Sequence, residues 1–168
     1  MESLLELDAR LSQRLHVADR PGLLRLLAVF LAHSGDSWFW LLGLGILWLV
    51  GSDFWKSRAL VLAASVLITA TLVLVVKFAV RRRRPEGEWG KIYRSTDPHS
   101  FPSGHAARAV MLAVMAALLG PSWLAALLLV WAPLVSLARI AMGLHFVSDV
   151  AAGMALGIAV GLILGRIF

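Results

Sequence analysis

The sequence predicts an all-α membrane protein, in which a bundle of six transmembrane helices follows an N-terminal amphipathic helix at the membrane interface. Hydrophobic residues make up 60% of the 168 residues, and the mean hydropathy is +0.81, whereas a soluble domain is about 45–50% apolar. The apolar residues also gather in six segments separated by polar stretches. We expect a single domain over residues 1–168, because no linker or low-complexity stretch divides the chain.

The first 20 residues predict the amphipathic helix. Its apolar stripe consists of Leu4, Leu5, Leu11 and Leu15. Charged residues lie between these leucines, which is typical of a helix in the plane of the membrane surface. Pro21 and Gly22 follow and should end the helix.

Spans are expected at about residues 22–33, 37–50, 58–80, 102–119, 122–141 and 146–167. The first two are shorter than the roughly 20 residues that cross a bilayer, so we interpret them as short or tilted spans joined by a tight turn at residues 33–36. The last span carries glycines at four-residue intervals from Gly153 to Gly165. Small residues at this spacing let helices approach closely. We expect them to pack within the chain, and although an oligomer is compatible with the sequence, nothing indicates one.

Six spans would place both termini on one side of the membrane. The basic residues on that side would be Arg10, Arg14, Arg20, Arg25, Lys56, Arg58 and Arg166. Because basic residues favour the cytoplasmic side, we expect cytoplasmic termini and an outward-facing site in the cell membrane. The residues Arg81–Arg84, Lys91 and Arg94 on the other side argue against this orientation, but cations placed for catalysis do not report topology.

Three polar clusters interrupt the apolar chain, and ionisable groups at membrane depth indicate a functional site. The first cluster is Lys77 and Arg84, followed by Pro85. On a continuous helix, Lys77, Arg81 and Arg84 would share one face, with Lys77 about 10 Å deeper than Arg84. A lysine at that depth needs an anion. The arginines could instead only anchor the helix among the lipid headgroups.

The second cluster is Pro102, Ser103, Gly104 and His105. Pro102 suits the first turn of a helix. The backbone N–H groups of the next three residues would then be free to bind an anion, together with the helix dipole. The alternative is an ordinary helix cap and turn.

The third cluster is Arg139, His145 and Asp149. His145 and Asp149 are four residues apart at the start of the last span, so their side chains share a face. A carboxylate that accepts the Nδ1 proton of His145 would leave Nε2 free as a nucleophile. The alternatives are a structural His–Asp pair and a metal site, but a metal needs more ligands than these residues and His105 readily supply.

Together the clusters resemble the signature of the type 2 phosphatidic acid phosphatase superfamily, whose motifs are K-x6-R-P, P-S-G-H and S-R-x5-H-x3-D. The chain matches the first two motifs fully and the third from Arg139 to Asp149, with Ala138 in place of the family's serine. The resemblance implies a six-helix bundle with its pocket at the outer leaflet, without metal or cofactor. Ala138 leaves one hydrogen bond near the phosphate in doubt.

The resemblance also implies the role of each residue. His145 would attack phosphorus and form a phosphohistidine, Asp149 would orient His145, and His105 would protonate the leaving oxygen and later deprotonate the attacking water. The phosphoryl oxygens would be held by Lys77, Arg84, Ser103, Gly104 and Arg139.

The expected function is metal-independent hydrolysis of a phosphomonoester or diphosphate on a membrane lipid whose tail stays in the bilayer. Undecaprenyl diphosphate or a related polyprenyl phosphate ranks first as substrate, ahead of phosphatidylglycerophosphate and phosphatidate. No nucleic-acid partner is expected, because the basic residues adjoin the spans. The alternatives are a protein that binds or flips lipid phosphates without hydrolysis, and a structural bundle whose polar residues only set topology.

Overall fold

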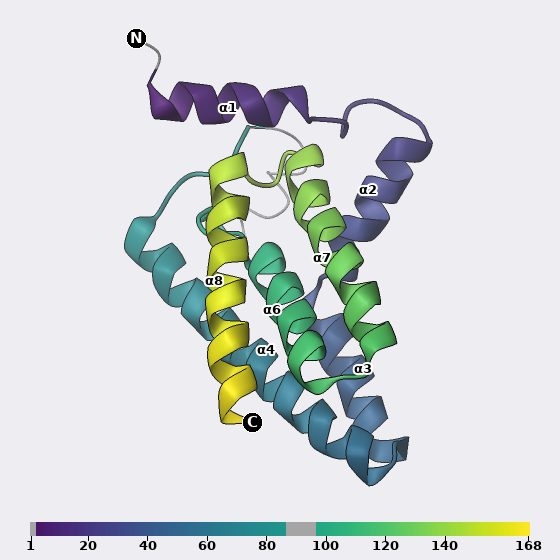
Figure 1. Ribbon diagram of the computed structural model, residues 1–168. Coiled ribbons are helices and arrows are strands. Elements are labelled where there is room, and N and C mark those ends of the chain that lie inside the picture. The colour runs from purple at the N-terminus through teal and green to yellow at the C-terminus, as the bar shows by residue number, and fades with distance from the viewer. Residues whose placement is uncertain (1–2, 87–96) are drawn as a thin grey trace.

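The computed structural model describes residues 3–86 and 97–168, and its regular structure is helical (Figure 1). The helices are α1 (Leu4–Arg14), α2 (Leu23–Ser34), α3 (Ser37–Val50), α4 (Asp53–Val80), α6 (Gly104–Leu119), α7 (Ser122–Ala141) and α8 (Val147–Ile167). Within these two ranges the only β-type pairing is an isolated bridge between Arg83 and His99. The all-α prediction is confirmed.

Three of the helices, α4, α7 and α8, are long and apolar enough to cross a membrane. Large apolar side chains remain exposed on their surfaces, among them Leu60, Leu67, Val75, Leu127, Val130 and Ile163. A continuous apolar exterior of this kind suits lipid better than water. The protein is therefore an integral membrane protein.

Helix α6 forms the centre of the bundle, where it packs against α8 and α7. The small residues on its buried face are Ala106, Ala107, Ala109, Ala113 and Ala116. A β-carbon on Gly153 or Gly157 of α8 would collide with the backbone carbonyl of Ser103 or Ala107. The glycine repeat thus packs within the chain, as predicted, and it brings the start of α8 against the start of α6.

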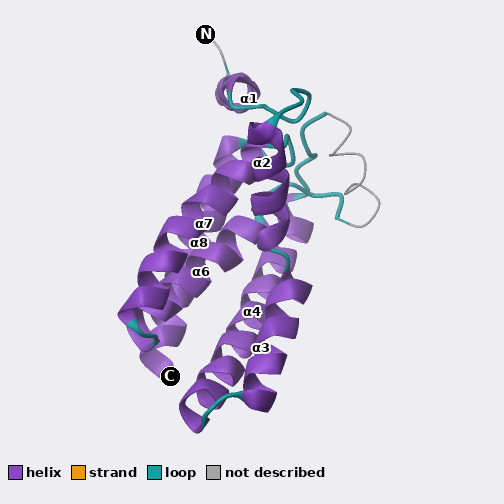
Figure 2. Cartoon of the chain, turned by 90° about the vertical axis from the view of Figure 1, so that its right-hand side faces the viewer, coloured by secondary structure: helices purple, strands orange, loops and turns teal. Residues whose placement is uncertain are grey.

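Helices α2 and α3 form one interrupted passage through the bundle. They lie end to end (Figures 1 and 2), and α2 packs against α7 while α3 packs against α4. With 12 and 14 residues, they are about 18 and 21 Å long, and each falls short of a hydrocarbon core about 30 Å thick. The structure therefore does not confirm two spans over residues 22–33 and 37–50, because the chain does not reverse between them.

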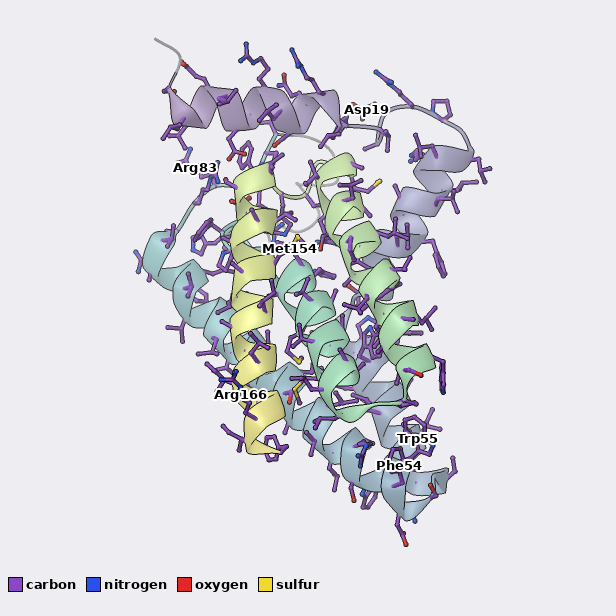
Figure 3. All side chains as sticks on the ribbon, viewed as in Figure 1. Asp19, Phe54, Trp55, Arg83, Met154 and Arg166 are labelled. Atoms are coloured by element: carbon purple, nitrogen blue, oxygen red, sulfur yellow. The ribbon has the colours of Figure 1, made fainter. Side chains whose placement is uncertain are left out.

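The two chain ends consequently lie at opposite ends of the bundle. Asp19, which follows α1, is at one end and Arg166, near the end of α8, is at the other (Figure 3). The expectation of both termini on one side fails because it counted α2 and α3 as two spans. The arginines of α1 lie at the same end as the polar clusters, so by the positive-inside rule they count against an outward-facing site, which stays a prediction. Lys91 and Arg94 lie outside the described residues.

Helix α1 lies across the end of the bundle at which α8 begins (Figure 1). Ser3 caps it by accepting a hydrogen bond from the N–H of Glu6 at 3.2 Å, and the helix ends at Arg14 instead of at residue 20. Its side chains cap α8 in turn, because the hydroxyl of Ser12 accepts a hydrogen bond from the N–H of Val147 at 3.0 Å. The predicted leucines are exposed, and their place at a membrane interface stays a prediction.

Candidate active site

The predicted site residues meet where α4 ends and where α6 and α8 begin. A cavity of about 230 Å³ lies there. It is lined by Ser37, Ala70, Val73, Leu74, Lys77, Asp97, Gly104, His105, Arg108 and His145. Cationic, acidic and imidazole groups thus share one small space with apolar residues of α4, as a lipid phosphate would require.

Lys77 and Arg84 converge on the carboxylate of Asp97, a residue outside the three motifs. Lys77 donates from Nζ to Oδ2 of Asp97, and Arg84 donates from Nη2 to the same oxygen at 2.7 Å. Burial by itself would raise the pKa of Asp97, but the hydrogen bond and charge of Lys77, with the charge of Arg84, hold it below its ordinary value. Asp97 is therefore an anion, and it satisfies the two buried cations that we expected to bind phosphate.

Lys77 and Arg84 lie side by side, but not because they share a helix face as predicted. Helix α4 ends just before Arg81, whose left-handed conformation (φ 53°) turns the chain out of the helix. Lys77, Arg81 and Arg84 therefore do not share a helix face. Arg84 folds back beside Lys77, and it is held there by donating to the carbonyl oxygens of Asp97 at 2.7 Å and Leu144 at 2.9 Å.

The second motif places a helix start at the cavity. Helix α6 begins at Gly104 with Ser103 as its cap, and not at Pro102. The N–H of Ser103 donates to the carbonyl of Asp149 at 2.9 Å, so it is not available to an anion. The N–H groups of Gly104 and His105 lie in the first turn, where a helix offers them no internal acceptor. With the helix dipole, they supply donors suited to an anion, and their predicted role in binding phosphate stays a prediction.

His145 lies in the loop between α7 and α8, and only 1% of it is exposed. Its Nε2 is 3.2 Å from Nη1 of Arg84. An arginine can only donate, so Nε2 of His145 carries the lone pair and Nδ1 carries the proton. Burial and the charges of Arg84, Arg139 and Lys77 lower the pKa of His145 well below its ordinary value. A neutral imidazole with its lone pair toward the cations is the state that a nucleophile requires.

His145 and Asp149 lie close together, as predicted, but their separation exceeds a hydrogen bond. Nδ1 of His145 is 3.6 Å from Oδ2 of Asp149, which is longer than a hydrogen bond. The same oxygen accepts the N–H of Phe146 at 2.9 Å, because Asp149 also caps the start of α8. Catalytic hydrogen bonds are often this long before substrate binds.

His105 also has a carboxylate partner, which the motifs did not reveal. Its Nε2 lies 2.6 Å from Oδ1 of Asp36, the residue that precedes α3. The carboxylate accepts, so Nε2 of His105 is protonated and Nδ1 is the position that can exchange a proton. The sequence signal for Asp36 was its place in the polar stretch between the first two apolar segments.

Arg139, at the end of α7, is 1% exposed and donates from Nη1 to the carbonyl of Ala32 at 3.2 Å. Its charge acts on both histidines, although it does not line the cavity. The neighbouring Ala138, which replaces the family's serine, packs in an apolar cluster with Ala28 and Ala32 of α2. Position 138 thus supports the contact between α7 and α2.

Arg82 links α1 to Asp149, the carboxylate beside His145. It donates from Nη1 to Oδ1 of Asp149 at 2.8 Å and from Nη2 to Oδ2 of Asp8 at 2.7 Å. Asp8 also accepts the N–H of Ser148 at 3.0 Å. The sequence could not show this network, because the turn after α4 decides which of the four consecutive arginines points inward.

Comparisons with known proteins point to one family. A family model described as the PAP2 superfamily matches residues 58–168. The decaprenylphosphoryl-5-phosphoribose phosphatase of Mycobacterium tuberculosis is 33% identical over 152 residues, which cover 90% of this chain and 84% of that protein. An undecaprenyl-diphosphatase of Sulfolobus acidocaldarius is 33% identical over 137 residues, which cover 78% of this chain and 64% of that protein.

Two crystal structures resemble the whole chain. A transmembrane PAP2-type phosphatidylglycerolphosphate phosphatase from Bacillus subtilis has a TM-score of 0.78 at 24% identity, covering 99% of this chain and 87% of that one. LpxE from Aquifex aeolicus has a TM-score of 0.75 at 25% identity, covering 95% of both chains. At 24% identity, the resemblance to the Bacillus subtilis structure shows the fold alone.

Proposed function

This chain belongs to the PAP2 superfamily and is a membrane lipid phosphatase, and we propose that it removes the terminal phosphate of a polyprenyl lipid through a phosphohistidine on His145. The observation that carries this proposal is the environment of His145. Its neutral imidazole turns Nε2 toward Arg84 at 3.2 Å, beside the cavity that Lys77, Gly104 and His105 also line.

In the first step, Nε2 of His145 forms a bond to phosphorus while the bond from phosphorus to the leaving oxygen breaks. Asp149 balances the positive charge that His145 acquires. Lys77, Arg84 and the N–H groups at the start of α6 bind the phosphoryl oxygens, because charge stabilisation is the main requirement of phosphoryl transfer. Arg139 adds a fixed positive charge behind them.

His105 handles the proton in both steps. It gives a proton to the leaving oxygen and then takes one from the water that attacks phosphohistidine and releases His145. Its contact with Asp36 at 2.6 Å supports this role, because a carboxylate on Nε2 stabilises the imidazolium form that the first step needs. No metal or cofactor is required by these steps, and metal independence is part of the proposal.

Asp97 competes with the substrate in this scheme. Its carboxylate holds Lys77 and Arg84, and a phosphate that binds both cations must displace it. A phosphate dianion carries more charge and more acceptor oxygens than one carboxylate, so the exchange favours the substrate.

The choice of a polyprenyl substrate is supported by the two curated relatives, whose names specify decaprenyl and undecaprenyl lipids. Phosphatidylglycerophosphate, the substrate in the name of a fold relative, ranks second. We further propose that the site faces the outer side of the cell membrane. The basic residues Lys56, Arg58 and Arg166 at the far end of the bundle support this, because they would mark that end as cytoplasmic. Arg10 and Arg14 of α1, at the site end, favour the opposite orientation by the same rule.

The experiment that tests this function is phosphate release in detergent, with a chelator present. Undecaprenyl diphosphate, phosphatidylglycerophosphate and phosphatidate would be given to the wild type and to His145→Ala, with Arg166→Gln as a control far from the site. We expect the wild type and the control to release phosphate, and His145→Ala to lose at least about 1,000-fold in rate. Tight lipid binding without release by the wild type would favour a binding or flipping protein.

A further inference from the structure

Arg108 of α6 lies beside the phosphoryl site, although it belongs to none of the three motifs. It lines the same cavity as His105 and His145, one helical turn after Gly104. Side chains on a helix lean toward its N-terminus, and the guanidinium accordingly rests over Gly104, where a β-carbon would lie 3.0 Å from Nη1 of Arg108. Arg108 therefore extends the anion site at the start of α6.

Arg108 differs from the other cations of the site because no hydrogen bond or ion pair joins it to a residue that the structure describes. Lys77 and Arg84 share Asp97, and Arg82 binds Asp8 and Asp149. For Arg108, the described part of the chain provides no hydrogen bond or ion pair, and its Nε is buried without a partner. The side chain of Arg108 is partly buried, and a charge that is partly removed from water without a partner is costly, so the arrangement indicates an anionic ligand.

The position of Arg108 indicates which part of a ligand it would meet. Arg84 lies against His145, to which the proposed mechanism attaches the transferred phosphate. Arg108 lies over Gly104, a position that Val73 of α4 also approaches. The acidic residues whose charges act on Arg108 are Asp36, the partner of His105, and Asp97. Arg108 is therefore placed toward the proton donor, on the leaving-group side.

We propose that Arg108 binds a second phosphate group on the leaving-group side of the scissile bond, so that the enzyme prefers lipids with two phosphates to lipids with one. This inference rests on the proposed function. In a diphosphate, Nε2 of His145 bonds to the terminal phosphorus, and the bond to the bridging oxygen breaks. That oxygen departs on the lipid monophosphate and takes a proton from His105. The departing group is an anion, and a guanidinium beside it stabilises its departure.

The test compares lipids that share a tail and differ in the second phosphate. Undecaprenyl diphosphate is paired with undecaprenyl phosphate, and phosphatidylglycerophosphate with phosphatidate. The two phosphates are joined directly in the first pair and separated by glycerol in the second, so the pairs distinguish the two sources of the second phosphate. Wild type, Arg108→Gln, Arg108→Lys and Arg166→Gln would be assayed on all four lipids.

We expect Arg108→Gln to lower kcat/KM for a two-phosphate lipid by about 10- to 100-fold and for its one-phosphate partner by less than about 3-fold. Arg108→Lys keeps the charge without the planar fork and should recover part of the loss. Arg166→Gln should match the wild type. Should Arg108→Gln fail to fold, Arg108→Lys alone decides, because a partial loss confined to two-phosphate lipids is still expected.

Equal losses within each pair, or no loss for any lipid, would overturn the role of Arg108 while leaving a His145-dependent phosphatase intact. Absence of phosphate release by the wild type on all four lipids would overturn the proposed function, and the inference about Arg108 with it.

Discussion

Nε2 of His105 lies 2.6 Å from Oδ1 of Asp36, so each histidine of the site has a carboxylate beside it. Asp36 lies in the short connection between α2 and α3. The interruption of this passage therefore delivers a carboxylate to the centre of the bundle, where an uninterrupted helix would have no reason to carry one. In the proposed mechanism, the interruption between α2 and α3 thus supports proton transfer by His105.

Replacing Asp36 with Asn should lower kcat by about 10- to 100-fold, because the imidazolium of His105 loses its counter-charge. KM should stay within about 3-fold, since Asp36 does not touch the phosphate cations in the structure. Steady-state kinetics on the preferred lipid measures both constants, with the exposed Asp19→Asn as the control. A rise in KM with kcat unchanged would show that Asp36 only shapes the cavity.

Asp97→Asn should make inorganic phosphate a better inhibitor, with a Ki lower by about 10-fold, or roughly 1.4 kcal/mol. The reason is that the competing anion on Lys77 and Arg84 is gone. The variant should also melt at a lower temperature than the wild type without phosphate, because two buried cations lose their partner, and added phosphate should restore the difference. Weaker inhibition by phosphate would mean that Asp97 orients the cations and does not compete.

The rate–pH profile should be bell-shaped, with an acidic limb that depends on Arg84. The active form of His145 is neutral, and its pKa is held below the ordinary value by burial and by the charges of Arg84 and Arg139. Activity is therefore lost as the pH falls through this lowered pKa. Arg84→Gln removes one of the charges, so the pKa rises and the acidic limb moves to higher pH.

This shift would be measured from kcat/KM between pH 5 and 9, with the exposed Arg83→Gln as the control. The height of the profile should fall as well, since Arg84 binds phosphate in the proposed mechanism, but only the pH at which the limb lies depends on the pKa of His145. A flat profile in the wild type would count against the assignment of the two histidines, and an unmoved limb in Arg84→Gln would count against the electrostatic role of that arginine.

The membrane topology can be tested by cysteine labelling, because the chain has no cysteine of its own. Asp19→Cys and Arg166→Cys place single thiols at opposite ends of the bundle (Figure 3). In intact cells, an impermeant maleimide should label one position and not the other, and the outward-facing site that we propose predicts labelling at position 19. Labelling of both or of neither would contradict the interrupted passage formed by α2 and α3.

Hydropathy and motif spacing were sufficient to predict the helical segments and the meeting of Lys77, Arg84, Gly104, His105 and His145. Hydropathy measures how apolar a segment is and not which way it runs, so it could not show that α2 and α3 continue in one direction. The lengths of α2 and α3 were the sequence signal for this arrangement, since neither helix is long enough to cross a bilayer alone.

The partners of the motif residues were harder to predict for another physical reason. Asp36 and Asp97 lie in irregular stretches, where no periodicity relates sequence distance to spatial distance. Ser103 was expected to offer its N–H to phosphate, but the close approach of α8 made that group a donor to Asp149 instead. This hydrogen bond depends on the packing of the α8 glycines against α6, and the spacing of glycines in the sequence does not show which helix they pack against.

The measurement that tests the central claim most directly is trapping of the phosphoenzyme. A lipid labelled in its terminal phosphate would be mixed with enzyme and quenched in alkali within the first turnover, using the wild type, His145→Gln and Arg166→Gln. We predict covalent label that survives alkali and is released by acid in the wild type and in Arg166→Gln, with none in His145→Gln. Label that persists in His145→Gln, or turnover by the wild type without any covalent label, would contradict a phosphohistidine on His145.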